Sequence, residues 1–239
     1  MLEATVEDVG GLDEATRRRM YALFQRYYDA TSEPRFLADL ADKHRVVLIN
    51  DETGRLCGFS TLAIDRLEHQ GRPLLVVFSG DTIIDRAHWG SQVFAHAWIR
   101  EIGRIAATAP DLPLYWLLIV KGHRTYRYLP TFGLTFVPDW RRPDDPALDA
   151  LKHALASRRF GPAYDPARGI VSFDRSRGHL AAEWAMPGER EARRADVRFF
   201  LARNPGYVRG DELVCLAALA PDNMRPLTRR LFEAGRSGQ

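Results

Sequence analysis

A strand, a short turn and a helix follow one another between Leu74 and Phe94, in the sequence LLVVFSGDTIIDRAHWGSQVF. The turn carries Trp89, Gly90 and Ser91, and an amphipathic helix begins after it. The first backbone N–H groups of a helix have no partner within the helix, and the helix dipole adds partial positive charge to them. The segment therefore predicts a binding site for an anion such as a phosphate group.

Two titratable side chains near this segment have the chemistry of proton transfer. Asp81 stands in the middle of the apolar strand, where burial would raise its pKa toward a range that suits a general base. A carboxylate that binds a neighbouring backbone amide is the structural alternative. His123 follows the apolar segment Leu112–Val120 and titrates near neutral pH, so it is a candidate base or proton shuttle, or else a solvated loop histidine.

A glycine interrupts the strand that carries Asp81. The pair Ser79–Gly80 lies inside the run Leu74–Ile84. Glycine within a strand often marks a bulge or a close approach of another backbone, so a bulge is predicted here. Alternatively, Gly80 only relieves crowding where the strand packs and marks no bulge.

The apolar spacing predicts the elements that position these residues. Asp13 caps a helix whose apolar face has the spacing i, i+3, i+4 and i+7, formed by Met20, Leu23, Phe24 and Tyr27. Ser32 and Pro34 begin a second helix, which carries Phe36, Leu37 and Leu40. Two helices are thus predicted before the first strong strand.

Three successive strands are predicted next. Arg45–Ile49 and Leu56–Ile64 flank a turn and predict an antiparallel hairpin, to which Leu74–Ile84 adds a third strand. A helix follows the Trp89–Gly90 turn and ends near Pro110. Leu112–Val120 is apolar nearly throughout, which predicts a strand covered on both faces and parallel to the strand before the helix.

The remaining segments complete this unit and extend it. A short helical segment over Arg124–Thr131 and a strand over Leu134–Val137 are expected. Pro138–Pro146 contains three prolines and five charged residues, which is typical of a linker. Beyond it the pattern predicts a helix over Ala147–Ala156, a strand near Ile170–Phe173, a helix ending at Asn204, a strand over Glu212–Leu219 and a helix capped by Asp222. The predicted division is residues 1–140 and 141–239, the second being an extension packed on the first or a small module.

This order of elements resembles the N-acetyltransferase-like (GNAT) superfamily over roughly residues 3–140, with an α/β (α+β) fold. The resemblance implies a mixed sheet, an antiparallel meander followed by a parallel crossover, flanked by helices. The superfamily signature Q/R-x-x-G-x-G/A aligns on Gly90 with Ala87-His88-Trp89-Gly90-Ser91-Gln92, so only the central glycine matches. Gln92 places a side chain where a small residue lets the backbone approach phosphate.

What the resemblance implies is an N-acyltransferase that moves an acyl group from acetyl-CoA, a longer acyl-CoA or a carrier-protein thioester to an amine. Backbone amides after the strand would hold the pyrophosphate, and the bulge would admit the pantetheine arm. The residues assigned to donor binding are Gly80, Ile83, Ile84, Trp89, Gly90, Ser91, Gln92 and Val93. The alternative is a catalytically silent module that binds acyl-CoA or another small ligand.

The chemistry implied by the resemblance needs a base, a polarised carbonyl and an acid. Asp81 is the first choice for the base. Superfamily members carry a tyrosine shortly before a Gly-Phe pair that protonates the departing sulfur. Tyr128 is the nearer match by spacing to Gly133-Leu134, and Tyr126 is the reserve.

Composition limits the other classes of function. The net charge is +3, and among 34 basic residues only Lys43, Lys121 and Lys152 are lysines. Acidic residues are interspersed throughout, so nucleic-acid binding is not expected. Cys57 and Cys215 lie in apolar runs, which predicts reduced thiols, and no ligand spacing predicts a metal.

The expected partners are a small-molecule or lipid-like amine, with an acyl carrier protein and a second copy of the chain as further candidates. No signal sequence and no membrane-spanning run is recognisable, so a cytoplasmic protein is expected. The motifs of hydrolases, P-loop kinases, zinc proteases and dinucleotide-binding dehydrogenases are missing from the sequence.

Overall fold

The computed structural model describes residues 1–174 and 176–238. Contacts divide the chain into two compact units, each built from strands covered by helices. The first unit consists of Met1–Arg26, Ser32–Leu114 and the segment from Leu219 onward. The second consists of Tyr27–Thr31 and Tyr115–Ala218. The α/β class predicted from the sequence is confirmed.

The two units do not divide the chain at residue 140, which differs from the division predicted above. In the first unit, α10 (Pro226–Arg236) packs against α3 (Val93–Ala107). In the second unit, β10 (Glu212–Ala218) pairs with β6 (Leu114–Val120). The C-terminal part of the chain thus supplies elements to both units, because β10 pairs with a strand of the second unit and α10 packs on a helix of the first.

The sheet of the first unit is antiparallel and has the order β1-β3-β4-β5. Its strands are β1 (Leu2–Asp8), β3 (Arg45–Asp51), β4 (Leu56–His69) and β5 (Arg72–Ile84). The predicted meander is confirmed, and β4 and β5 extend further than predicted, to a turn where Gly71 has a φ of +74°. The expectation that two helices precede the first strand is wrong, because β1 pairs with β3 at the edge of the sheet. Its alternating Leu2, Ala4 and Val6 are the period-two signal of such a strand.

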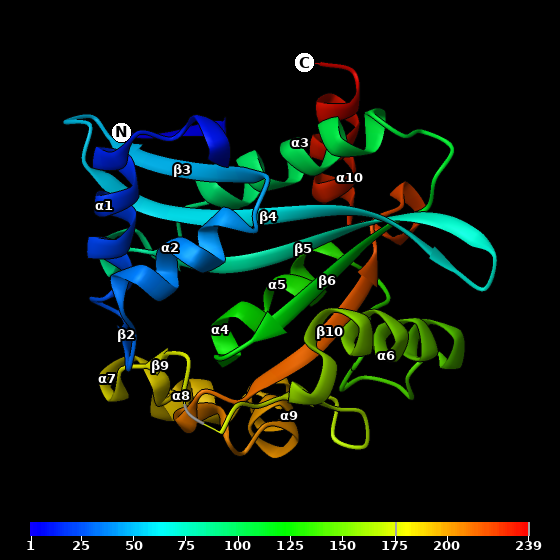
Figure 1. Cartoon of the computed structure of the whole chain (residues 1–239). Helices are drawn as coiled ribbons and strands as arrows, with labels where there is room; N and C mark the ends of the chain where they lie inside the picture. Colours follow the sequence, from blue (N-terminus) through cyan, green and yellow to red (C-terminus); the bar gives the residue numbers. More distant parts are fainter. Residues whose placement is uncertain (175, 239) are drawn as a thin grey trace. The chain divides into compact units, whose positions relative to one another are not determined.

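Both helices predicted near the N-terminus are present as α1 (Glu14–Phe24) and α2 (Glu33–Ala41). The Thr16 amide donates to the carboxylate of Asp13 over 2.6 Å, so Asp13 caps α1 as predicted. The side chain of Ser32 makes no capping bond to α2. In Figure 1, α1 and α2 lie on one face of the sheet and α3 lies on the other.

Two glycines allow α3 and α10 to pack at very short range, as the adjacent green and red helices in Figure 1 show. A Cβ atom on Gly103 would lie 2.1 Å from the Phe232 carbonyl oxygen, and one on Gly235 would lie 2.0 Å from that of Arg100. Only glycine permits this backbone contact. The predicted Asp222 cap is wrong, because Asp222 belongs to the 3-10 turn η5 (Pro221–Asn223) and Arg225 is the N-cap of α10.

The strands of the second unit have the order β6-β10-β8-β7. β8 (Ile170–Val171) and β7 (Tyr164–Asp165) are short, and α6 (Pro146–Phe160) packs against β10. A small sheet pairs β2 (Tyr28–Asp29) with β9 (His179–Leu180). The other helices of this unit are α4 (His123–Tyr126), α5 (Tyr128–Phe132), α7 (Ala182–Ala185), α8 (Glu189–Ala192), α9 (Ala195–Arg203), η3 (Gly161–Ala163) and η4 (Tyr207–Arg209).

The strand predicted over Leu134–Val137 is replaced by a single bridge in which Val137 and Leu216 exchange backbone hydrogen bonds of 2.9 and 2.8 Å. β10 occupies the pairing edge of β6, so this segment adds no strand there. Pro138–Pro146 is exposed over most of its length, as expected of a linker, but its start is anchored, since Asp139 is buried and accepts hydrogen bonds from Arg141. Within residues 1–174 and 176–238, the helices lack the length and apolar character needed to cross a membrane.

Candidate functional site

The predicted bulge in β5 is present. Ser60 pairs with Thr82 and Leu62 pairs with Ser79, so the register shifts between them and Gly80 and Asp81 together oppose a single residue of β4. A bulge of this kind bends the strand and re-aims the side chains beside it. Asp81 is half-buried, less covered than its place in an apolar strand suggests.

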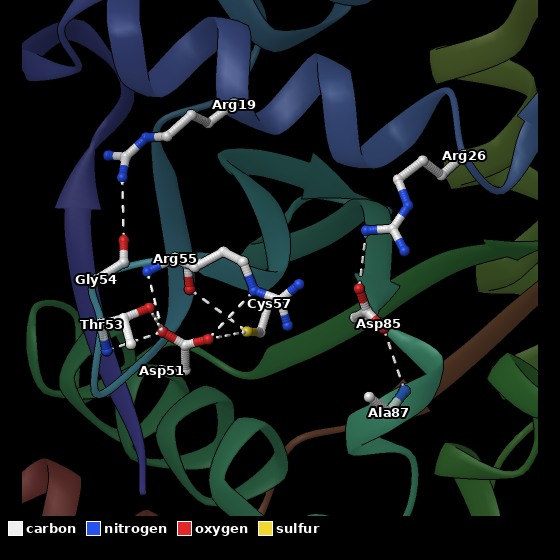
Figure 2. A network of polar contacts seen from close by, with 9 residues as sticks. All are labelled: Arg19, Arg26, Asp51, Thr53, Gly54, Arg55, Cys57, Asp85 and Ala87. Carbon is white, nitrogen blue, oxygen red and sulfur yellow. Dashed lines mark hydrogen bonds and ion pairs between the residues drawn. The ribbon is translucent and has the colours of Figure 1, made fainter.

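β5 ends at a buried carboxylate that the sequence analysis missed. The Asp85 amide donates to the Cys57 carbonyl over 2.7 Å, and the Asp85 side chain accepts hydrogen bonds from the Ala87 amide and from Arg26, at 3.1 and 2.9 Å. Figure 2 shows the contacts of the Asp85 side chain with Arg26 and Ala87. Burial acts to raise the pKa of Asp85, but the Ala87 amide and Arg26 outweigh it and hold the pKa below its usual value.

A tight turn connects this carboxylate to α3. η2 (Arg86–His88) follows Asp85, and the indole N–H of Trp89 donates back to the Ile84 carbonyl over 2.8 Å. Gly90 has a φ of +95°, a conformation that L-residues with a side chain rarely adopt. Among the described residues, no heavy atom outside its chain neighbours lies within 4 Å of where a Cβ on Gly90 would be. The backbone at Gly90 is therefore open to a ligand.

Polar side chains order the first turn of α3. The Val93 amide donates to the Ser91 hydroxyl over 3.3 Å, and the Ser91 amide donates to the His88 carbonyl over 3.1 Å. Gln92 is the N-cap residue, and its side-chain oxygen lies 3.1 Å from the ring nitrogen Nε2 of His96. The N-terminus of this 15-residue helix carries the partial positive charge that favours an anion.

Residues of the turn between β3 and β4 make hydrogen bonds to the first residues of β4. Asp51 accepts hydrogen bonds from Thr53 and Arg55, and its Oδ2 atom lies 3.7 Å from the Cys57 sulfur (Figure 2). Hydrogen bonds from Thr53 hold the pKa of Asp51 well below its usual value. Burial raises the pKa of the Cys57 thiol, and both Cys57 and Cys215 are free and buried as predicted. Cys57 is therefore a structural thiol beside the strand end.

The predicted site residues are distributed over both units. Asp81 and all the donor-binding candidates, Gly80, Ile83, Ile84, Trp89, Gly90, Ser91, Gln92 and Val93, belong to the first unit. His123, Tyr126 and Tyr128 belong to the second unit. Within the first unit, the bulge lies in β5 and the turn directly follows it, so the predicted anion-binding turn and the candidate base are held by the same element.

His123 is buried, which differs from the solvated loop histidine of the alternative interpretation. Its side chain is 1% exposed, and within the described part of the chain neither ring nitrogen has a hydrogen-bond partner. Its Nε2 atom lies 3.5 Å from the Glu191 carboxylate, which also accepts from Arg124 over 3.1 Å. Burial lowers the pKa of His123, Arg124 adds to this effect, and Glu191 opposes it.

The two candidate tyrosines have different surroundings. Tyr126 is fully buried among Phe136, Trp140, Phe199 and Phe200, and its hydroxyl donates to the Pro138 carbonyl over 2.7 Å. Burial raises its pKa far above the usual range. Tyr128 is half-buried beside Phe132, and burial raises its pKa to about 12 while Arg127 opposes the shift. The environment of Tyr126 is that of a core residue, which leaves Tyr128 as the candidate acid.

Within residues 1–174 and 176–238, no group of three or more His, Cys, Asp or Glu side chains is arranged to hold a metal ion.

No family model matches the sequence, and no curated protein matches it either. Solved structures match parts of it. A probable N-acyltransferase from Enterococcus faecalis is 15% identical with a TM-score of 0.41, and the match covers 57% of this chain and 33% of that one. A GNAT-family N-acetyltransferase from Escherichia coli in complex with CoA is 14% identical with a TM-score of 0.40, over 56% of this chain and 71% of that one. An acyl-CoA N-acyltransferase from Pseudomonas aeruginosa is 19% identical with a TM-score of 0.37, over 56% and 91%.

These likenesses extend over little more than half of this chain, and the chain spans a third of the length of the Enterococcus protein. The function proposed below rests on the residues of this chain.

Proposed function

We propose that the chain is a GNAT-like N-acyltransferase that moves an acyl group from an acyl-CoA thioester to an amine. The observation that carries the proposal is the form of β5. This strand has a bulge at Gly80–Asp81 and ends in the anchored turn that leads through Gly90 into α3. One element thus holds both a candidate reaction point and a candidate anion site.

The spacing of these two points favours a long donor over a compact anion. Gly80 and Ile84 are four residues apart in an extended strand, which corresponds to roughly 13 Å at about 3.3 Å per residue. A ligand that uses both points needs an anionic end, a connecting chain and a reactive end. Acyl-CoA has this form, with a pyrophosphate, a pantetheine arm and a thioester.

The proposed reaction conserves atoms and charge. The neutral acceptor amine attacks the carbonyl carbon of the thioester, and Asp81 accepts the proton that the nitrogen loses as the carbon–nitrogen bond forms. The carbon–sulfur bond breaks, and the sulfur leaves with the bonding electron pair and takes up a proton to become the CoA thiol. Tyr128 is proposed as the source of that proton, on the basis of its position in the sequence. His123 is the reserve for proton transfer.

Donor binding is tested by calorimetry with CoA, acetyl-CoA and a long-chain acyl-CoA. We expect saturable binding by the wild-type protein. Gly90→Ala is expected to weaken binding at least tenfold, about 1.4 kcal/mol, because it adds a Cβ at the anion site and strains the turn. Gly71→Ala is the matched control, since Gly71 also has a positive φ and open space around it at the tip of the β4–β5 hairpin. Equal losses in both variants, or no binding of any CoA species by the wild type, would contradict the proposal.

Turnover is tested by release of free thiol from the donor in the presence of a panel of amines, both small and lipid-like. Asp81→Asn is expected to lower kcat at least 100-fold with donor affinity retained, a loss typical of removing a general base. Asp222→Asn, an exposed aspartate in η5, is the matched control and should retain wild-type kcat. Wild-type activity in Asp81→Asn would remove Asp81 from the reaction.

A silent binding module is the second candidate, and Gln92 favours it. Its side chain occupies the position where a small residue lets phosphate approach, and it contacts His96 on the first turn of α3. Binding of acyl-CoA without thiol release for any amine would support this candidate.

If the protein does release thiol, the identity of the acyl donor is tested by comparing turnover of acyl-CoA with turnover of acyl-pantetheine. Equal turnover of the two indicates a carrier-protein thioester, whose recognition does not need the adenosine diphosphate.

A further inference from the structure

A series of polar side chains connects α6 to β7 within the second unit. Asp149 and His153 are one helical turn apart on α6, and the Nε2 atom of His153 lies 3.2 Å from Oδ2 of Asp149. The other ring nitrogen of His153, Nδ1, lies 2.6 Å from the hydroxyl oxygen of Tyr164 on β7. A carboxylate, an imidazole and a phenol thus follow one another, each in contact with the next.

Lys152 holds the carboxylate at the start of this series. Its side chain is 2% exposed, and its ammonium group pairs with Oδ1 of Asp149, the oxygen that His153 does not contact. Burial acts to raise the pKa of Asp149, but Lys152 and His153 outweigh it and hold the pKa below its usual value. Asp149 is therefore ionised at neutral pH and accepts a hydrogen bond from Nε2–H of His153. Nδ1 of a neutral His153 is then the acceptor for the Tyr164 hydroxyl.

The hydroxyl of Tyr164 depends on this imidazole for its reactivity. Burial raises the pKa of Tyr164, and the negative charges of Asp149 and Asp165 raise it further. The phenol is thus neutral at neutral pH, and it becomes a nucleophile only as a base removes its proton. His153 already contacts that proton. The side chain of His153 is also 31% exposed, so the base lies at the surface while Tyr164 is buried.

We propose that Tyr164 is the nucleophile of a second reactive site, which takes small activated acyl esters. A hydroxyl, an imidazole in contact with it and a carboxylate that orients the imidazole form the arrangement that activates hydroxyl nucleophiles on unrelated folds. Here Tyr164 supplies the hydroxyl, His153 the base and Asp149 the orienting carboxylate. The burial of Tyr164 limits the ester to a small one, which enters from the side of His153.

The proposed step conserves atoms and electrons. The phenol oxygen of Tyr164 forms a bond to the carbonyl carbon of the ester, and His153 takes the phenol proton at Nδ1. The bond from that carbon to the leaving oxygen breaks, and the oxygen keeps the bonding electron pair. His153 passes the proton to the leaving group, and an acyl-tyrosine remains. The step involves neither Asp81 nor the turn at Gly90, so it is independent of the proposed acyl transfer to an amine.

The test uses p-nitrophenyl acetate and the full-length protein, without CoA and without an amine acceptor. Mass spectrometry of peptides locates the acetyl groups, and hydroxylamine removes those on phenol oxygen but not those on lysine. We expect Tyr164 to be acetylated at least about tenfold faster than Tyr21 or Tyr115, because a positioned base assists its reaction. Tyr21 and Tyr115 are half-buried, so exposure alone would make both react before Tyr164.

A pair of histidine variants then tests the base. His153→Gln is expected to slow acetylation of Tyr164 at least about 100-fold, which is the low end of the contribution of a positioned base. His69→Gln, a half-buried histidine at the end of β4, is the matched control and should keep the wild-type rate.

The alternative is that the same contacts only fasten β7 to α6, which predicts no special reactivity of Tyr164. Acetylation of Tyr164 no faster than that of Tyr21 in the wild type would overturn the inference, whether or not His153→Gln folds. An equal rate at Tyr164 in the wild type and in folded His153→Gln would overturn it as well. Because CoA and amine are absent, neither result depends on the outcome for acyl transfer.

Discussion

The Arg26 guanidinium donates a hydrogen bond of 2.9 Å to the Asp85 carboxylate and ties the chain just after α1 to the turn that follows β5. Only the aspartate is buried, with a side chain 7% exposed against 55% for the arginine. The same carboxylate caps η2 through the Ala87 amide. Asp85 is thus the anchor of the turn, and Arg26 balances its charge.

Replacement of the two partners is therefore expected to have unequal effects. Asp85→Ala removes two hydrogen bonds to a buried charged group and is expected to cost about 2 kcal/mol of unfolding free energy. Arg26→Met is expected to cost less than about 1 kcal/mol, because its exposed guanidinium is screened by solvent. Urea denaturation at pH 7 measures both. Since the pKa of Asp85 is lowered in the folded protein, its contribution is present at neutral pH and is lost as the pH falls below 3.8, through the lowered pKa.

The packing of α3 on α10 makes a second prediction. Gly103→Ala and Gly235→Ala each place a methyl group about 2 Å from a backbone carbonyl of the facing helix, so the helices must move apart. We expect each change to cost at least about 2 kcal/mol. Gly10→Ala is the control, because in the described part of the chain no heavy atom outside the chain neighbours of Gly10 lies within 4 Å of the added Cβ. A melting temperature that falls equally in all three variants would contradict this account of the helix contact.

Replacement of the two tyrosines is expected to affect different properties, namely stability for Tyr126 and activity for Tyr128. Tyr126→Phe leaves the buried Pro138 carbonyl without its hydroxyl donor and is expected to cost about 1–3 kcal/mol of unfolding free energy, with kcat unchanged. Tyr128→Phe is expected to lower kcat with little effect on stability, because no acid then meets the leaving sulfur. Parallel denaturation and thiol-release measurements test both. A loss of kcat in Tyr126→Phe alone would reverse the assignment.

The buried imidazole of His123 predicts a pH dependence of stability. Burial lowers its pKa in the folded protein below the usual 6.5, so between these two values the unfolded chain binds a proton that the folded protein does not. Stability is therefore expected to fall as the pH decreases below 6.5. His123→Gln should flatten this part of the profile of unfolding free energy against pH, whereas His69→Gln, at the end of β4, should leave it unchanged. An identical slope in wild type and His123→Gln would exclude His123 as its source.

Much of the first unit could be predicted because its signals are local. The cap at Asp13, the helical spacing in α1 and α3, and the glycine inside β5 each act within a few residues, and all appear in the structure. β1 is not predicted although its alternating pattern is visible, because its acidic and polar residues make it a weak strand signal taken alone.

Lysine is rare in this sequence, and only the structure shows that its three lysines are enclosed and paired. The three lysines in this arginine-rich chain have side chains 1%, 14% and 2% exposed, and each is paired with a carboxylate: Lys43 with Asp39, Lys121 with Glu212 and Lys152 with Asp149. The rarity of lysine was visible in the sequence, but the places of burial were not.

The sequence by itself determined the types and order of most elements, the bulge and the turn before α3, because helix and strand periodicity and glycine conformations depend on near neighbours in the chain. The tertiary structure alone decided that β10 pairs with β6, that α10 packs on α3, and that the side chains of Lys43 and Thr61 approach β5 at Gly80. These relationships join residues far apart in the chain. Their physical cause is the burial of one apolar surface against another, and local spacing does not identify which two surfaces meet.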